Sequence, residues 1–589
     1  MTFIRPARPV RVKPTASAVS LSVALALGLG GQAALAQDVA REDTVIFDLD
    51  RTIKDPENFN PFTEGTKRVH GAHQTMWEPL FILNYESGEL EPWLGESIEP
   101  NESFDEWTLT LKEGITWSDG ESFDADDVVF TLEMVKGSEE LTDREASAIR
   151  SQVESVEKVD ERTVRMTLNA SNPRFGIENF GVRIVTSLLI MPEHVWAGEN
   201  PATFPFYPPI GTGPYTFGSA ATNRAVWNRH DDYWGAEAGF QELPEPARII
   251  FLETGGEESR AQLMAANELD AAQSVTIGTF EAIQAQNPNV IAWADGYPYS
   301  AADPCARQIE FNTELEPWSD PRLRKAIAHL IDRNQIVNIA YEGTTTPSTT
   351  MFAAYGSMQP FIDAVVEAGY ELPSKADVEA GQALLEEAGY ARGDDGFYAR
   401  DDEVLEANIH VNSASTEYTK TIDVVVEQLN RAGIRAKSIP VENGVFWGET
   451  LPLGNYEMSY SWLSCGSVNE PWSSMSRYTV DSVVPVGEAA PGFNNTGRWD
   501  SEAAEAYSET VAEMGTLAPD DSALPGLTAE AYAHLDAEMP FIPLVQAAKL
   551  LPFNTTYWTG WPTAENDYNH PFFWWNSAHQ IVHALEAVE

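Results

Sequence analysis

The chain has 589 residues, of which 43% are hydrophobic and 11% aromatic, and its formal net charge at pH 7 is -53. This composition is that of a globular protein with enough chain for two or three domains. So large an excess of carboxylates excludes nucleic-acid binding, which needs clustered Lys and Arg, and disfavours binding to an anionic membrane surface. The acidic residues are spread along the chain, which is typical of a strongly solvated surface.

The first segment indicates export. The first 15 residues hold four cations and no acidic residue, an apolar run extends over 16–31, and Ala34-Leu35-Ala36 precedes Gln37. A basic region, a short apolar region and an A-x-A site predict a secretory signal peptide over 1–36, with cleavage near Ala36–Gln37. No Cys follows that site, so we expect no lipid anchor, and no later window predicts a transmembrane helix. The mature protein is therefore expected in the periplasm.

The first part of the mature chain combines strands and helices. Its patterns predict, in order, a strand at 43–50, a helical stretch through His73 and Trp77 to Leu83, a β-hairpin in WTLTLKEGITWSDG around Trp107 and Gly114, a helix at 124–136 and a strand pair at 156–168. A Gly/Pro loop at 208–219 then leads into a further strand.

Two separate β-α modules follow. Residues 248–272 predict a strand, a Gly turn and a helix, whereas 407–441 predict strand, helix and strand. The second order implies a parallel strand pair with a crossover helix. A capped helix pair at 319–343 lies between the modules. Two modules with their own strands predict two α/β lobes, with an antiparallel insertion after the first strand.

Several segments, taken in this order, resemble the large extracellular solute-binding proteins of the oligopeptide/dipeptide/nickel type, family 5. The matching pieces are NPF at 60–62, EPLF at 78–81, LGESIEPNESFDEWTLTLKEGITWSDGESFDADDVVFTLE at 94–133, IGTGPYTF at 210–217, DDYWG at 231–235, IEFNTELEPWSDPRLRKAIAHLIDR at 309–333, NYEMSYSW at 455–462 and MPFIPL at 539–544. The resemblance runs from about residue 43 to the C-terminus and is specific as a set.

The resemblance implies a two-lobed periplasmic-binding-protein fold of the α/β class, with a hinge between the lobes and an extra domain inserted in lobe 1. Lobe 1 would comprise about 37–300 and 546–589, with the extra domain near 80–208, and lobe 2 about 301–545. The family's partners are inner-membrane ABC permease subunits and their ATPases, which receive a small solute. We expect a monomer without cofactor or bound metal.

The two cysteines, Cys305 and Cys465, are expected to form a disulfide, because a thiol pair in an exported chain is usually bridged. When the relatives are aligned on the Asn-Glu-Pro triplet, Cys465 falls where their bridged Cys lies. Cys305 precedes IEFNTELEPWSDPR, as its partner would.

The candidate ligand region is 444–475, which is rich in Trp, Tyr and turn residues. In peptide-binding relatives, an Asp four residues before the Pro of this loop holds the peptide's ammonium group. Ser467 stands at that distance from Pro471, whereas alignment on Trp462 places Cys465 there instead. Near the Arg that some peptide binders use for the peptide carboxylate, this chain has Tyr460. Both charge-reading positions are thus neutral, which favours a neutral ligand with hydroxyls, since an unpaired buried ammonium is costly.

Aromatic walls with a few polar groups are typical of a ligand site, and sugar faces pack on aromatic rings. The candidate ligand-binding residues are Trp447, Tyr460, Trp462, Gly466, Ser467, Asn469, Trp472, His73 and Trp77. Each Trp has core packing as its alternative role, and Ser467 and Asn469 could be turn formers. The spacing of His70 and His73 would suit a metal on a helix, although a pair on a helix surface is the simpler interpretation.

These patterns predict a non-enzymatic binding component of an ABC importer, with a neutral oligosaccharide as the favoured ligand, since several family members bind oligosaccharides. Oligopeptide or dipeptide binding is the alternative within the same class. The alternative from another class is a secreted retaining glycoside hydrolase that uses Glu470 of Asn-Glu-Pro; otherwise Glu470 is a solvated loop carboxylate. That enzyme needs a second carboxylate about 5 Å away and usually a TIM barrel. The sequence lacks eight β-α repeats, and the predicted hairpins of 94–170 contradict that architecture. No G-x-S-x-G, H-E-x-x-H or P-loop motif occurs.

Overall fold

The strand predicted at 43–50 is β1 (Thr44–Leu49), which lies at the edge of a four-stranded sheet. It pairs in parallel with β11 (Arg248–Glu253), and β10 (Arg224–Arg229) and β9 (Tyr215–Ala221) extend the sheet in antiparallel fashion. The helix α6 (Glu257–Ala265) follows β11, which confirms the predicted β-α unit. The computed structural model describes residues 39–49, 51–63, 71–182, 187–575 and 577–589, so the predicted signal peptide lies outside the described residues.

A second sheet is inserted between β1 and β11. Its strands, in the order β4 (Gly95–Pro100), β5 (Glu106–Leu111), β7 (Thr163–Leu168) and β6 (Val153–Lys158), are all antiparallel, and the predicted strand pair at 156–168 is confirmed. The predicted helix at 124–136 is α1 (Ala125–Gly137), which begins after the capping carboxylate of Asp124.

The predicted hairpin around Gly114 is wrong. β5 pairs with β4 and β7, and the second half of WTLTLKEGITWSDG makes only an isolated bridge between Thr116 and Ser122. The reason is tertiary: the indole of Trp117 is buried and donates a hydrogen bond to the Asp127 carboxylate of α1, at 3.1 Å. This second apolar run therefore packs against a helix instead of folding back on β5.

The helix predicted through Trp77 to Leu83 is also wrong within the described residues. From Gly71 to Trp77 the chain makes consecutive turns, and 81–83 is the strand β2 (Phe81–Leu83). Gly71 adopts φ +82°, and Pro79 has no N–H to continue a helix. The spacing of the aromatic and apolar residues in this segment resembles that of a helix, but these residues are buried in turns and a strand.

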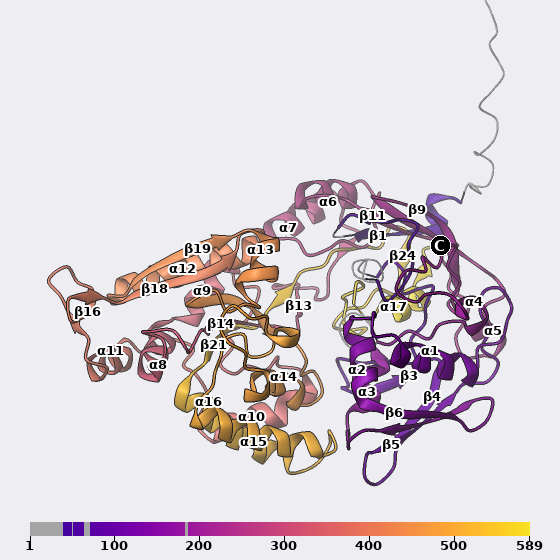
Figure 1. Ribbon diagram of the computed structural model, residues 1–589. Coiled ribbons are helices and arrows are strands. Elements are labelled where there is room, and N and C mark those ends of the chain that lie inside the picture. The colour runs from indigo at the N-terminus through magenta and orange to yellow at the C-terminus, as the bar shows by residue number, and fades with distance from the viewer. Residues whose placement is uncertain (1–38, 50, 64–70, 183–186, 576) are drawn as a thin grey trace, which may run out of the picture. The chain divides into compact units, whose positions relative to one another are not determined.

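A third, five-stranded sheet carries the second β-α module. Its order is β19 (Arg435–Val441), β18 (Glu406–Asn412), β20 (Met458–Ser464), β14 (Ala306–Phe311) and β21 (Phe541–Val545). β18 and β19 are parallel and joined by α12 (Thr416–Ala432), as predicted. The predicted helix pair is α8 (Pro321–Leu330) and α9 (Arg333–Ala340), and α12 lies along β18 and β19 (Figure 1).

The chain passes from the first sheet region to the third through β13 (Ala301–Ala302) and returns through β22 (Ala548–Lys549). These two short strands pair with each other. After the return, β23 (Phe553–Asn554) pairs with β12 (Val290–Ile291). The pairing agrees with the expected C-terminal return to the first lobe, whose boundaries stay a prediction.

Other elements surround these sheets. The remaining helices are α2 (Arg144–Gln152), α3 (Phe175–Asn179), α4 (Glu193–Trp196), α5 (Trp234–Glu237), α7 (Ile277–Gln286), α10 (Gln359–Glu367), α11 (Val378–Glu387), α13 (Asn443–Val445), α14 (Trp472–Met475), α15 (Glu502–Thr516), α16 (Leu524–Glu538) and α17 (Ala578–Ala584). Short strands complete the list: β3 (Leu90–Pro92), β8 (Gly181–Val182), β15 (Ala391–Arg392), β16 (Tyr398–Arg400), β17 (Glu403–Val404), β24 (Trp558–Thr559) and β25 (Glu586–Ala587). α15 and α16 run side by side (Figure 1). None of the helices in the described part of the chain combines the length and apolarity that a membrane crossing requires.

The predicted disulfide is confirmed, and Cys305 and Cys465 join the ends of the paired strands β14 and β20 across 160 residues of sequence. Because this cross-link closes a long loop in the unfolded chain, the double variant Cys305→Ser/Cys465→Ser should lose about 3–5 kcal/mol of unfolding free energy. Urea unfolding of the variant and of the oxidised wild type measures this loss. Equal midpoints for the two proteins would contradict it.

Candidate functional site

Three aromatic rings form a partly exposed cluster, here called the aromatic platform: Trp447, which is half-buried, and the exposed Trp462 and Phe493. Trp447 follows α13, within a π-helical turn at 446–450, and Trp462 lies on β20. The ring centroids of Trp447 and Trp462 are 5.3 Å apart, and those of Trp447 and Phe493 6.2 Å. Trp462 is 41% exposed and Phe493 37%, so part of each ring is accessible to a ligand. Exposed, clustered rings of this kind can stack on a ligand.

The loop after Cys465 turns its serine inward. The Ser467 hydroxyl is buried, donates to the Pro471 carbonyl at 2.9 Å and accepts from the Ser474 N–H at 3.0 Å. The Ser474 hydroxyl in turn accepts from the Ser467 N–H at 3.0 Å. An added Cβ at Gly466 would collide with Ser473, so the close approach of the backbone explains that glycine. These bonds fix the shape of the loop in the way the turn-former interpretation expects.

The other two candidates of this loop face different neighbours. Asn469 is half-buried, and its Cβ lies close to the backbone of Gly88, from the insertion after β1. Trp472 is half-buried, and its indole N–H donates to the Val511 carbonyl of α15 at 3.1 Å. The structure therefore does not bring Trp472 into the aromatic platform with Trp447 and Trp462.

Tyr460 belongs to the buried core and not to the aromatic platform. It is fully buried, its ring packs edge-on against Tyr418 at 5.2 Å, and its hydroxyl is 3.4 Å from that of Tyr341. Burial, together with the nearby carboxylate of Glu417, raises the pKa of the Tyr460 hydroxyl, so this group stays neutral.

His73 and Trp77 are buried in the first sheet region. The Trp77 indole donates to the Ile210 carbonyl at 2.8 Å, its ring stacks on Phe206 at 5.7 Å, and His73 meets its edge. His70, the other half of the hypothetical metal pair, lies outside the described residues. Within the described ranges, no group of three or more His, Cys, Asp or Glu side chains is arranged to hold a metal ion.

A partly buried charge network lies beside the strand that carries Trp462. Arg307 on β14 lies opposite Trp462 in the strand register and is paired with Glu417 of α12 at 2.6 Å. The Asp303 carboxylate lies 3.7 Å from Arg307 and 3.4 Å from Lys549 of β22. Two cations therefore face two carboxylates, and the network is balanced in charge.

The pKa of Glu417 reflects this network. Burial alone would raise it, but the charges of Arg307 and Lys549 and the hydrogen bonds from Arg307 and Tyr341 hold it at about 2. The Tyr341 hydroxyl donates to Glu417 at 2.8 Å. Glu417 is thus an anion at any physiological pH, and its charge is committed to Arg307.

Glu470, which lies within the candidate ligand region 444–475, is not the solvated loop carboxylate that one alternative expects. It is 3% exposed, pairs with Arg174 at 3.1 Å and accepts hydrogen bonds from the N–H groups of Trp472 and Ser473. Arg174 precedes α3 and comes from the insertion after β1. The carboxylate is therefore paired and covered.

Sequence reasoning missed Phe493, Arg174 and the Arg307–Glu417 pair. Phe493 stands in a Gly/Pro-rich stretch whose composition indicates only a loop. Arg174 and Glu470 are 296 residues apart. The one available signal was at Arg307, two residues after the bridged Cys305, on a strand whose burial means that a charge needs a partner.

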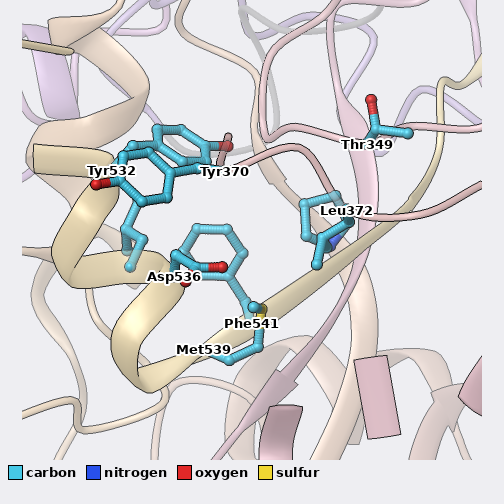
Figure 2. A pocket seen from close by; sticks show the side chains of 9 residues that line it. Thr349, Tyr370, Leu372, Tyr532, Asp536, Met539 and Phe541 are labelled. Atoms are coloured by element: carbon cyan, nitrogen blue, oxygen red, sulfur yellow. The ribbon is translucent and has the colours of Figure 1, made fainter. Parts of the chain in front are cut away.

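A separate pocket lies between α16 and β21. It encloses about 290 Å³, its open mouth included, and its lining is mainly apolar: Thr349, Tyr370, Leu372, Tyr532, Leu535, Asp536, Met539, Phe541 and Pro543. Figure 2 shows Tyr532 and Asp536 reaching it from α16. It shares no residue with the aromatic platform, and Asp536 is engaged by Lys325 at 3.1 Å.

The sequence model of the bacterial extracellular solute-binding proteins, family 5 Middle, matches residues 89–483. The chain belongs to this family. Its members are binding proteins that act outside the cytoplasm. Glutathione-binding protein GsiB of Salmonella paratyphi A is 24% identical over 91% of this chain and 94% of its own length. Haem-binding protein A of Haemophilus influenzae is 26% identical over 58% of this chain and 62% of its own. With this protein and with protein XP55 of Streptomyces lividans, the match spans less than two thirds of the relative's length.

Solved structures give the same fold. The periplasmic oligopeptide-binding protein of Thermotoga maritima superposes with a TM-score of 0.80 at 25% identity, covering 93% of this chain and 100% of its own. Its mannohexaose-bound form gives a TM-score of 0.74 at 24% identity, covering 93% and 99%. The predicted fold class is therefore confirmed: this family 5 protein has the two-lobed α/β fold of periplasmic binding proteins.

Glu417 should make the stability of this family 5 protein depend on pH in the acid range. Because its folded-state pKa lies below the ordinary 4.5, its stabilisation is complete above about pH 4.5 and is lost as the pH falls toward 2. Glu417→Gln should lower the unfolding free energy at pH 7 by about 2–3 kcal/mol, and by much less at pH 3.

Urea unfolding at pH 7, 4.5 and 3 measures this difference. The matched control is Glu427→Gln on the same helix, where an exposed i,i+4 pair with Arg431 predicts almost no change. An equal loss for Glu417→Gln at pH 3 and pH 7 would show that its effect is not electrostatic.

Proposed function

We propose that this protein is the periplasmic binding component of an ABC importer, exported by the signal peptide over 1–36 and working as a monomer without catalysis. It captures a small solute as its two lobes close and delivers it to the membrane permease and its ATPases. Membership of family 5 and the two-lobed fold support this role. Two α/β lobes joined by short strands are built to hinge on a ligand.

We assign the lobes as residues 37–300 with 546–589, and 301–545, with the extra domain near 80–208. The pairing of β1 with β11 and of β23 with β12 supports the composition of the first lobe. The pairing of β14 with β21 supports that of the second. The paired crossings β13 and β22 would then form the hinge.

The ligand we propose is a neutral oligosaccharide, and the observation that carries this choice is the exposed ring of Trp462 packed against the half-buried ring of Trp447, with a charge-balanced network on the neighbouring strand. Stacked rings offer an apolar face to the C–H groups of a sugar. Arg307 and Glu417 neutralise each other, so the wall beneath Trp462 offers no free charge for a peptide terminus. The mannohexaose-bound Thermotoga maritima structure supports the choice by likeness of fold.

Two alternatives to oligosaccharide binding can be tested. Oligopeptide binding by the same lobes is favoured by relatives such as the putative ABC transporter peptide-binding proteins of Brucella, 26% identical over 54% of this chain. Glycoside hydrolysis by Glu470 is disfavoured, because that carboxylate is covered and bound to Arg174, whereas an acid/base group has to reach its substrate.

Thermal-shift screening tests the ligand class, because a ligand that binds only the native state raises the unfolding midpoint. Neutral tetra- to hexasaccharides should raise it by several degrees, and free-ended di- to pentapeptides should not. A peptide that raises the midpoint, and loses this effect on N-acetylation, would overturn the neutral-ligand assignment. Hydrolysis of aryl-glycosides that disappears in Glu470→Gln would instead establish the enzyme.

Trp462→Ala tests the platform. The variant should weaken binding of the best oligosaccharide by about 1–3 kcal/mol, because it removes a stacking surface. Its thermal midpoint without ligand should stay close to the wild-type value, since the ring is 41% exposed. Trp462→Phe, which keeps an aromatic face, should recover part of the affinity. An unchanged affinity in Trp462→Ala, measured by calorimetry, would remove this ring from the site.

A further inference from the structure

We propose that the ion pair between Arg174 and Glu470 is a latch that holds the extra domain of lobe 1 against the ligand loop of lobe 2. The inference rests on the two-lobe division of the proposed function. It makes Arg174 a positioning residue for ligand binding, and it gives Glu470 a role that is neither catalytic nor ligand-binding.

The Arg174 guanidinium makes its hydrogen bonds to residues of the other lobe. One terminal nitrogen donates to Glu470 at 3.1 Å, and the other to the carbonyls of Gly515 at 3.2 Å and Leu517 at 3.1 Å. The guanidinium also lies 4.8 Å from the ring centre of Trp472. Within its own domain the structure holds the backbone of Arg174: its N–H donates to the Asn172 side chain at 2.9 Å, and its carbonyl accepts from the Glu178 N–H at 2.9 Å.

Lobe 2 presents two kinds of acceptor to Arg174: carbonyl groups at a helix end and a fixed carboxylate. The carbonyls of Gly515 and Leu517 come from the C-terminal end of α15, where the helix dipole favours a cation. Glu470 holds the N–H groups of Trp472 at 2.8 Å and Ser473 at 3.2 Å, so its carboxylate is fixed within the loop whether or not Arg174 is present. Arg174 is therefore received by a preformed acceptor set.

Because the pair is buried, losing one partner affects the closed and open arrangements differently. Arg174 and Glu470 are 2% and 3% exposed, so both charges are removed from water when the domains meet. A buried ion pair that keeps both partners is close to neutral in free energy, whereas one that loses a partner leaves an uncompensated charge. Removing Arg174 alone thus penalises the closed arrangement and not the open one, where water solvates Glu470.

The latch acts on the loop that leads back to the platform. Glu470 lies five residues after Cys465, whose disulfide anchors β20, and Asn469 beside it approaches Gly88 of the opposite lobe. Closing therefore fixes the loop at both ends. A ligand that binds only the closed arrangement has an apparent affinity equal to its intrinsic affinity multiplied by the fraction of protein that is closed.

The test measures the closed:open ratio without any ligand. The described residues contain no free cysteine, so fluorophores can be placed on Val159→Cys of the extra domain and Val378→Cys of lobe 2, which are 44% and 45% exposed. Single-molecule energy transfer then reports the distance between the lobes. Arg174→Gln should lower the closed:open ratio by about tenfold or more, and the added Glu470→Gln should restore part of it, because the orphaned charge is gone.

Arg260→Gln is the matched control, since it removes a buried guanidinium whose partner, Asp48, lies in the same lobe. It should lower the thermal midpoint and leave the closed:open ratio unchanged. A ratio in Arg174→Gln within about twofold of the wild type, or no recovery in the double variant, overturns the latch. Failure of the proposed function is distinguishable, because it would appear as a wild-type distance that no solute changes while the effect of Arg174→Gln persists.

Discussion

The antiparallel pairing of β14 with β20 is the constraint on which the candidate site depends. It sets Arg307 opposite Trp462, and the disulfide from Cys305 to Cys465 locks one end of the pair. β14 is buried along its whole length, so a slip in its register would separate the buried Arg307 guanidinium from the Glu417 carboxylate. Through Asp303 and Lys549 the same pair is tied to the crossing strands β13 and β22. The exposed ring of Trp462 is thus held by a rigid support.

Buried arginines organise the electrostatics of this highly acidic chain. The chain has 90 carboxylates against 37 Lys and Arg, and its interior carboxylates are held in two ways. Glu78 and Glu310 accept hydrogen bonds from neutral donors, whereas others are paired with a guanidinium. Arg307 meets Glu417, Arg174 meets Glu470, and in each pair the guanidinium is at most 4% exposed by its side chain. Arg suits this task because its planar, weakly hydrated group binds several acceptors at once. The acidic residues face solvent in large numbers, whereas the charges beside Trp462 are balanced by pairing.

Local patterns predicted elements well where the element and its partner are close in sequence. The capping carboxylate of Asp124 marked the start of α1, and the alternation over 407–441 predicted β18, α12 and β19 with their parallel pairing. The patterns failed where distant packing decided the outcome. Trp117 packs on α1 instead of extending a hairpin, and the turns after Gly71 carry buried residues that mimic a helix. Local periodicity cannot tell which neighbour a hydrophobic residue will meet.

The sequence by itself determined the α/β class, the family resemblance and the disulfide partners, because these are recorded in residue order and in a single possible thiol pair. It also identified Trp447 and Trp462 as candidates. Only the tertiary structure decided that these two rings lie together with Phe493, that Tyr460 and Ser467 point into the interior, and that Glu470 is bound by Arg174. The physical reason is distance along the chain: a contact between residues 296 positions apart has no local signature, and it exists only once the domains that carry them have folded and met.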